Sequence, residues 1–383
     1  MFLQYENKKE ESDILKKAGT FKDFYLDENQ STLIKGDNFI ALSKLLKQYK
    51  SKIDLIYIDP PYNTNRVFTV SDGRSSTISN ASNGQVAYFD NLKKEEYIEF
   101  LRERLILLRE LLSEKGSIYL HIDSKMGHYV KIIMDEIFGE ENFKNDISRI
   151  KSNPKNFGRK AYGNYKDAIL FYSKNYKKNI FNNIKIPLTE KEIKKRFEKV
   201  DKLGRYTTVP IHAPGETLSG ATGKEWNGII PPAGRHWRYH PDKLTELNKA
   251  GLIEWSSTGN PRLKNYADGH KGKKIQDIWE YKDPSKPLYP TEKNKEMLKM
   301  IIQQSSKKNS IILDCFAGSG STLIAAQELN RTWIGIDSSE VAIKTIVKRF
   351  HDVRYNYIEI DKEDIILQTE NRPLAEQLEI SLQ

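Results

Sequence analysis

Short apolar runs alternate with helix-like stretches along the first part of the chain. The pattern predicts strands over 31–35, 53–58, 117–122 and 168–172, and helices over 38–48, 93–114 and 125–138. The helix over 93–114 is the clearest, because its apolar residues from Tyr97 to Leu112 recur every three or four positions and form one stripe. Residues 63–91 are rich in Ser, Asn, Thr and Gly with little periodicity, so we expect a long mobile loop there.

The same rhythm returns near the end of the chain. It predicts helices over 292–304, 321–329 and 341–350, and strands over 311–314 and 332–336. Between about 174 and 285 it gives way to charged turns, Gly/Pro clusters and isolated tryptophans. Alternating strands and helices favour an α/β fold with a mostly parallel sheet and helices on its faces. The sequence therefore predicts a Rossmann-like domain that is interrupted by an insertion.

Length and composition narrow the class of protein. The chain has 383 residues, enough for two structural units, and 38% of them are hydrophobic. No run of about 18 apolar residues occurs, so we expect no membrane-spanning helix. Residues 1–17 are rich in Lys and Glu and do not resemble a secretory signal. The single cysteine, Cys315, fits a reducing compartment, so we expect a cytoplasmic protein of a prokaryotic cell.

The basic charge is concentrated in the middle of the chain. The whole chain has 62 Lys and Arg against 52 Asp and Glu, and residues 151–290 alone hold 28 against 14. A uniformly Lys-rich composition would not give this asymmetry. A basic middle segment between nearly neutral ends indicates one unit that meets a polyanion such as nucleic acid.

A glycine-rich turn follows the strand predicted at 311–314. The sequence from Asp314 to Gly320 reads DCFAGSG, and a helix is predicted directly after it. Glycines allow a tight turn and close approach of a ligand to the backbone, while the helix N-terminus offers unpaired N–H groups. The strand at 332–336 ends before Asp337, where a carboxylate can accept hydrogen bonds from ribose hydroxyls. The turn by itself is weak evidence, but together these features indicate a nucleoside site.

A second motif, Asp59-Pro60-Pro61-Tyr62, ends the buried strand predicted at 53–58. The prolines have no N–H group, so the Asp59 carboxylate and the Pro60 carbonyl can both act as acceptors. Acceptors beside the aromatic ring of Tyr62 suit a planar ring that carries an NH₂ group. The alternative interpretation of this motif is a proline-terminated strand with a surface tyrosine. It is disfavoured because both motifs belong to one split sheet.

These residues resemble the permuted, β-class amino DNA methyltransferases that use S-adenosylmethionine, including type III-like and type II N6-adenine enzymes of restriction-modification systems. In that family DPPY comes first and FxGxG last; here they match residues 59–62 and 316–320, with the basic segment between them. Residues 290–293 resemble the family's PTxK element, and 236–255 and 278–279 resemble its recognition region. The departures are small: Tyr289 replaces a common His and Asp337 a frequent Glu.

The resemblance implies a domain arrangement and a set of site residues. The catalytic domain would span 1–173 and 289–351, around a target-recognition insertion at 174–288 whose basic region begins near 151, and 352–383 would form a tail. Asp59, Pro60, Pro61 and Tyr62 would be catalytic. The cofactor would contact Asp37, Asp59, Thr291, Lys293, Asp314, Phe316, Gly318, Gly320 and Asp337. The substrate would be a flipped-out base of double-stranded DNA, contacted by Asn63, Lys151, Lys155, Arg159, Lys160, Arg235 and Arg238.

Several alternatives can be weighed. Methylation at N6 of adenine is favoured, and N4 of cytosine stays open because it uses the same amine chemistry, usually with Ser in place of Asp59. Cytosine-C5 methylation needs a cysteine nucleophile, and Cys315 lies inside the presumed cofactor turn. A catalytically silent DNA-binding relative also stays open, as do a homodimer and a separate restriction subunit. His236 and His240 have a metal-like spacing but no evident third ligand, so we expect no metal.

Overall fold

The computed structural model describes residues 2–22, 24–61, 66–71, 74–76, 85–90, 93–152, 160–284, 287, 292–360 and 366–368. They form two compact units, unit 1 from residues 1–183 and 276–383, and unit 2 from residues 184–275. No helix in the described ranges is long and apolar enough to cross a bilayer.

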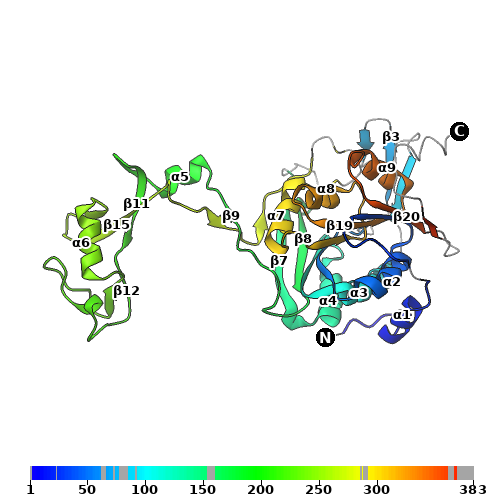
Figure 1. Cartoon of the computed structure of the whole chain (residues 1–383), viewed down its shortest axis with the longest axis horizontal. Coiled ribbons are helices and arrows are strands. Elements are labelled where there is room, and N and C mark those ends of the chain that lie inside the picture. Colours follow the sequence, from blue (N-terminus) through cyan, green and yellow to red (C-terminus); the bar gives the residue numbers. More distant parts are fainter. Residues whose placement is uncertain are drawn as a thin grey trace. The chain divides into compact units, whose positions relative to one another are not determined.

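A ten-stranded, mostly parallel sheet forms the centre of unit 1, in the order β17-β7-β8-β6-β2-β18-β19-β1-β20-β21 (Figure 1). The β6-β2-β18-β19-β1-β20 run is parallel, whereas β8 is antiparallel to both of its neighbours and β21 to β20. The predicted mostly parallel α/β architecture is therefore confirmed. The strands are β1 (Thr32–Lys35), β2 (Ile53–Ile58), β6 (Leu112–Ile122), β7 (Phe143–Ile150), β8 (Lys166–Ser173), β17 (Ile278–Trp279), β18 (Ile311–Asp314), β19 (Thr332–Asp337), β20 (Asn356–Ile360) and β21 (Ile366–Gln368).

Helices cover both faces of this sheet (Figure 1). On one face α1 (Glu11–Ala18), α2 (Asn38–Tyr49), α3 (Lys94–Leu111) and α4 (Gly127–Phe138) bury their apolar stripes in one continuous core with the strands. On the other face lie α7 (Lys295–Ser305), α8 (Ser321–Glu328) and α9 (Glu340–Arg349). The helix predicted at 93–114 ends at Leu111, because Leu112 already pairs with Ile53 of β2.

Three segments of unit 1 differ from the sequence expectation. Residues 63–91, expected as a loop, contain a small antiparallel sheet of β3 (Arg66–Ser71), β4 (Arg74–Ser76) and β5 (Gln85–Asp90). The tail expected from residue 352 contributes β20 to the main sheet, in parallel register with β1. Ile278 and Trp279, expected in the recognition region, pair with β7 and belong to unit 1. These strands were missed because strand propensity depends strongly on tertiary context and gives only a weak signal in a short segment.

Unit 2 has its own small core. Ile211, Trp226, Trp237, Leu244 and Ile253 are buried together, and the rings of Trp226 and Trp255 stack with centroids 5.7 Å apart. Its main sheet has the order β10-β11-β15-β14, and two pairs of strands, β12-β13 and β16-β9, accompany it. Its elements are β9 (Lys185–Ile186), α5 (Glu190–Arg196), β10 (Lys199–Asp201), β11 (Gly204–Pro210), β12 (His212–Pro214), β13 (Arg235–Trp237), α6 (Pro241–Lys249), β14 (Ile253–Trp255), β15 (Pro261–Tyr266) and β16 (Lys273–Lys274).

Candidate active site

Four neighbouring parallel strands, β2, β18, β19 and β1, place their carboxyl ends at the same edge of the sheet of unit 1. The segments that follow these strands surround a cavity of about 260 Å³. Asp59 and Gly318 both line it, although 258 positions separate them in the sequence. The cavity therefore joins the acid-proline motif and the glycine-rich turn in one pocket, at the edge where open parallel sheets bind their ligands.

The acid-proline motif forms one wall of this pocket. Asp59 and Pro61 line the cavity, and Pro60 between them is buried. Tyr57 also lines it, because residues two positions apart in a strand point to the same side. This period of two could have identified Tyr57 from the sequence. Tyr62 and Asn63, which were predicted to stack on the base and to contact DNA, lie outside the described residues.

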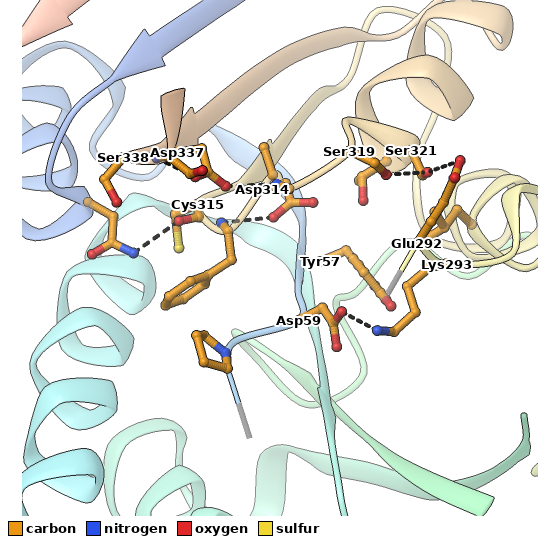
Figure 2. A pocket seen from close by; sticks show the side chains of 18 of the residues that line it. Tyr57, Asp59, Glu292, Lys293, Asp314, Cys315, Ser319, Ser321, Asp337 and Ser338 are labelled. Carbon is orange, nitrogen blue, oxygen red and sulfur yellow. Dashed lines mark hydrogen bonds and ion pairs between the residues drawn. The ribbon is translucent and has the colours of Figure 1, made fainter. Parts of the chain in front are cut away.

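Asp59 forms an ion pair with Lys293, which approaches from the segment before α7 (Figure 2). The side chains of Asp59 and Lys293 are only 15% and 9% exposed, so the pair is shielded from bulk water. The ring atom Nδ1 of His121 lies 3.9 Å from Asp59 Oδ1. Lys293, predicted as a cofactor contact, thus lines the pocket but holds the carboxylate of the predicted catalytic residue.

The glycine-rich turn forms the opposite wall. Gly318 and Gly320 have φ values of +51° and +74°, a region that favours glycine, and Gly320 starts α8. Asp314 Oδ1 accepts a hydrogen bond from Phe316 N at 3.0 Å, which closes the turn. The Gly318 N–H donates to Asp337 Oδ2 at 2.8 Å, so the turn is tied to the end of β19.

Two carboxyl groups of this wall have raised pKa values, that of the buried Asp314 and that of the half-buried Asp337. Burial raises the pKa of Asp314 to about 7, although hydrogen bonds from Thr322 and the Phe316 N–H oppose this shift. Burial also raises the pKa of Asp337, against the hydrogen bonds that it accepts from the backbone of Ser339, Gly318 and Ser338. A cation in the pocket would therefore stabilise the ionised form of both carboxyl groups, because a nearby positive charge lowers the pKa of a carboxyl group.

A third wall comes from the segment after β1. Asp37 caps α2 by accepting hydrogen bonds from Phe39 N at 2.8 Å and Ile40 N at 3.1 Å. Arg104 of α3 lies 3.4 Å from Asp37 Oδ2 and also donates to Asn38. Asn38 Nδ2 in turn donates to the Cys315 carbonyl at 3.0 Å. This chain of contacts joins the predicted cofactor residue Asp37 to the glycine-rich turn.

The thiol of Cys315 is unsuited to nucleophilic attack. Its side chain is 1% exposed, and burial raises the pKa of the thiol well above its usual value. A thiol that does not ionise is a poor nucleophile. The rejection of a cytosine-C5 mechanism therefore has a structural reason.

Sequence reasoning missed a polar cluster beside Lys293. Glu292 forms an ion pair with Arg349 of α9 and lies 3.4 Å from the Ser321 hydroxyl, which is 2.9 Å from that of Ser319 (Figure 2). Glu292, Ser319 and Ser321 line the pocket. Glu292 lies inside the PTxK-like element, so its position next to Lys293 was the available indication. Thr291 of that element lies outside the described residues.

The pocket as a whole is acidic. Five carboxylate residues line it against one lysine, and no other Lys or Arg is found among the described lining residues. The carboxylates belong to Asp37, Asp59, Glu292, Asp314 and Asp337. Such a pocket suits a ligand with a positive charge and hydroxyl groups that donate hydrogen bonds. Within the described ranges, no group of three or more His, Cys, Asp or Glu residues is arranged to hold a metal ion.

The residues predicted to contact DNA fall into three groups. Asn63, Lys155 and Arg159 lie outside the described residues. Lys160 is exposed in unit 1, whereas the Lys151 ammonium group lies 2.6 Å from Asp167 and its charge is already matched.

Arg235 and Arg238 form the third group, in unit 2, where both are exposed and contact His212. Arg235 Nη1 lies 3.1 Å from His212 Nδ1, and Arg238 Nε donates to the His212 carbonyl at 3.1 Å. Burial and the charges of Arg235, Arg238 and Arg262 lower the pKa of His212. Unit 2 holds 18 Lys and Arg against 10 Asp and Glu, so it carries most of the net charge of +10.

The sequence of this chain is similar to those of known DNA methylases. Residues 53–348 match the N6/N4 family model described as DNA methylase. The type II methyltransferase M.EcaI of Enterobacter cloacae is 44% identical over 91% of this chain and 77% of its own length. The StyLTI Mod subunit of a type III restriction-modification enzyme from Salmonella typhimurium is 28% identical over 80% of this chain and 51% of its own. Among solved structures, the cytosine-N4-specific PvuII DNA methyltransferase has 13% identity and a TM-score of 0.45, covering 84% of this chain and 87% of that one.

Proposed function

The chain belongs to the family of S-adenosylmethionine-dependent N6/N4 DNA methylases, and from this premise we propose that it methylates the exocyclic N6 of adenine in double-stranded DNA. The observation that carries the proposal is the position of Asp59 and Pro61 on the wall opposite the glycine-rich turn of one acidic pocket.

The pocket fits the cofactor that the family uses. S-adenosylmethionine supplies a methyl group on a positively charged sulfur, and the carboxyl groups of Asp314 and Asp337, whose pKa values are raised, favour a cation beside them. The positive φ of Gly318 favours glycine at this position. Because glycine has no side chain, a ligand can approach the backbone of the turn. Phe316, Gly318 and Asp337 would hold the nucleoside part, and Asp37 closes the pocket at the end of β1.

The acid-proline wall supplies the hydrogen-bond acceptors that an aromatic amine needs in order to react as a nucleophile. The lone pair of such an amine is delocalised into its ring, so it is a weak nucleophile. The Asp59 carboxylate and the Pro60 carbonyl would accept its two hydrogens and favour a pyramidal nitrogen. Lys293 keeps Asp59 in place through their ion pair, so the acceptor is positioned before the base arrives.

Unit 2 is proposed as the part that recognises the DNA sequence. Its positive charge and the exposed Arg235 and Arg238 suit contacts with phosphates, which position a duplex without reading its bases. A base inside a duplex must be flipped out to reach any such pocket, at a cost of a few kcal/mol that phosphate contacts help to offset. A homodimer and a separate restriction subunit remain proposals that follow from the resemblance.

Cytosine-N4 methylation is the second candidate, because it requires the same acceptors for the same kind of amine. Asp59 favours adenine, since the resemblance associates the cytosine-N4 enzymes with Ser at this position.

The decisive experiment incubates the protein with unmethylated genomic DNA and S-adenosylmethionine and analyses the hydrolysed nucleosides by mass spectrometry. N6-methyladenine is expected, and N4-methylcytosine in its place would reverse the assignment of the base. Asp59→Ala should retain cofactor binding and lose methyl transfer. Asp146→Asn, which changes an exposed carboxylate of β7, is the matched control and should retain both. Unchanged turnover of Asp59→Ala would refute the proposed role of Asp59.

A further inference from the structure

A buried histidine lies directly behind the acid-proline wall. His121 belongs to β6, the neighbour of β2, and is 0% exposed. Its Nδ1 atom lies 2.9 Å from the Tyr57 hydroxyl and 3.9 Å from Asp59 Oδ1. Its Nε2 atom lies 3.3 Å from Asp167 Oδ2, on β8. Tyr57, His121 and Asp167 thus form a polar chain from the pocket into the sheet.

The charges around this chain keep Asp167 ionised. Burial opposes its charge, yet the hydrogen bond with His121 and the charge of Lys151 hold the pKa of Asp167 well below its usual range. Lys151 Nζ is 2.6 Å from Asp167 Oδ1, and Arg149 Nη1 of β7 is 3.8 Å from Oδ2. Asp167 therefore acts as an acceptor toward His121.

The same surroundings keep His121 neutral near pH 7. Burial lowers the pKa of its imidazole, opposed by Asp167 and Asp59 and reinforced by the charge of Lys293. Because an ionised Asp167 can only accept, the hydrogen of the neutral ring belongs on Nε2, and Nδ1 is an acceptor. Burial raises the pKa of Tyr57 well above its usual value, so the phenol stays protonated. Its O–H group therefore donates a hydrogen bond to Nδ1 of His121. The chain thus has a defined direction, from Tyr57 to His121 to Asp167.

We propose that His121, held by Asp167, is a positioning residue that acts through Asp59 and receives the proton that the target amine gives up. This inference rests on the proposed function. Once the amine nitrogen carries the methyl group, one N–H bond breaks, its electron pair stays on nitrogen, and the proton goes to the Asp59 carboxylate.

The second step moves this proton from Asp59 to Nδ1 of His121. The 3.9 Å separation has to close by about 1 Å to reach hydrogen-bond distance. The Tyr57 hydroxyl turns, so that its oxygen accepts the new N–H. The resulting imidazolium faces the Asp167 carboxylate, and Asp59 returns to its ionised state beside Lys293. After the methylated base leaves, the proton passes back through Asp59 to water in the open pocket, and His121 is neutral again before the next amine binds.

His121→Gln is the sharpest variant, because the amide can still donate to Asp167 but cannot take up a proton. The measurement is the single-turnover rate of methyl transfer from pH 5 to 8 at saturating S-adenosylmethionine, so that the titration of Asp314 does not enter the profile through cofactor binding, together with the affinity for S-adenosylhomocysteine. In the natural protein the rate should fall on the acid side as His121 becomes protonated. In His121→Gln the rate should drop at least roughly tenfold and lose this acid limb, with the affinity nearly unchanged.

His128→Gln, at an exposed position of α4, is the matched control and should keep both the rate and the acid limb. If His121→Gln keeps the natural rate, or keeps the acid limb, the inference is wrong. If the natural protein itself transfers no methyl group to DNA, it is the proposed function that fails.

A second measurement needs no substitution of His121. In nitrogen-15 spectra of the seven histidines at pH 7.5, the ring whose Nδ1 signal shifts in Tyr57→Phe should be neutral with its hydrogen on Nε2. A hydrogen on Nδ1 of that ring would overturn the inference, whatever the kinetics show. This test uses neither DNA nor cofactor, so its result does not depend on the methyl-transfer activity.

Discussion

Replacing Gly320 by alanine tests whether the glycine-rich turn is fixed by its packing. Gly320 begins α8 with φ +74°. A Cβ atom at this position would lie 2.8 Å from Cγ1 of Ile346, a fully buried residue of α9. The substitution therefore combines an unfavourable backbone conformation with a steric clash against a side chain that has no room to move.

The magnitude follows from these two effects. A non-glycine residue in the left-handed region costs about 1–2 kcal/mol, and overpacking a close-packed core costs about 1–3 kcal/mol. We therefore expect Gly320→Ala to lower the free energy of unfolding by about 2–5 kcal/mol. The turn from Phe316 to Gly320 must also shift, so the affinity for S-adenosylhomocysteine should fall.

Gly251→Ala separates the two effects. Gly251 has φ +71°, and no atom lies within 4 Å of an added Cβ, so this substitution strains the backbone without a steric clash. This control should lose only about 1–2 kcal/mol and bind S-adenosylhomocysteine normally. Urea unfolding and titration calorimetry measure both quantities. Equal unfolding free energies and equal affinities for the two variants would refute the reasoning.

Two further predictions concern charge. Burial raises the pKa of Asp314 from its usual 3.8 to about 7, so the folded chain keeps a proton that the unfolded chain releases; stability should fall by up to about 1.4 kcal/mol per pH unit as the pH rises from about 4 to 7. Asp314→Asn should flatten this dependence in urea unfolding, and an unchanged slope would contradict the assignment. In unit 2, removing both Arg235 and Arg238 should reduce the slope of log Kd for DNA against log salt by about 2, measured by fluorescence anisotropy. Removing the exposed Lys243 and Lys249 instead should leave the slope unchanged, and equal slopes for the two double variants would exclude the arginines from the interface.

The central strands could be read from the sequence because they are buried on both faces. The runs 53–58 and 311–314 were predicted with the bounds that β2 and β18 have, and such strands appear as nearly continuous apolar runs. Their carboxyl ends carry the two motifs, so most of the pocket wall followed from the sequence. By contrast, β7 and β20, which lie near the two edges of the sheet, were not predicted from the sequence. β7 has the sequence FKNDISRI and β20 has NYIEI, in which polar residues interrupt the apolar pattern.

The contacts behind the pocket could not be predicted from the sequence either, because they depend on the order of the strands in the sheet rather than on the spacing of residues along the chain. His121 meets Asp167 only because β8 runs antiparallel beside β6. Asp167 lies opposite Arg149 only because β7 pairs with β8 in that register. A buried histidine in an apolar strand reads as an ordinary core residue until its neighbours are known. Sequence reasoning therefore found many of the residues that line the pocket and missed those that contact them from behind.

The geometry of the pocket depends on the pairing of two central strands rather than on the order of motifs along the chain. Leu55 and Ile56 of β2 pair with Ile312 and Leu313 of β18, and this register places Asp59 and Asp314 at one edge. Unit 2 lies between these strands in the sequence. An insertion at this point of the chain leaves the register of β2 and β18 unchanged, so the two motifs meet at one edge of the sheet although unit 2 separates them in the sequence.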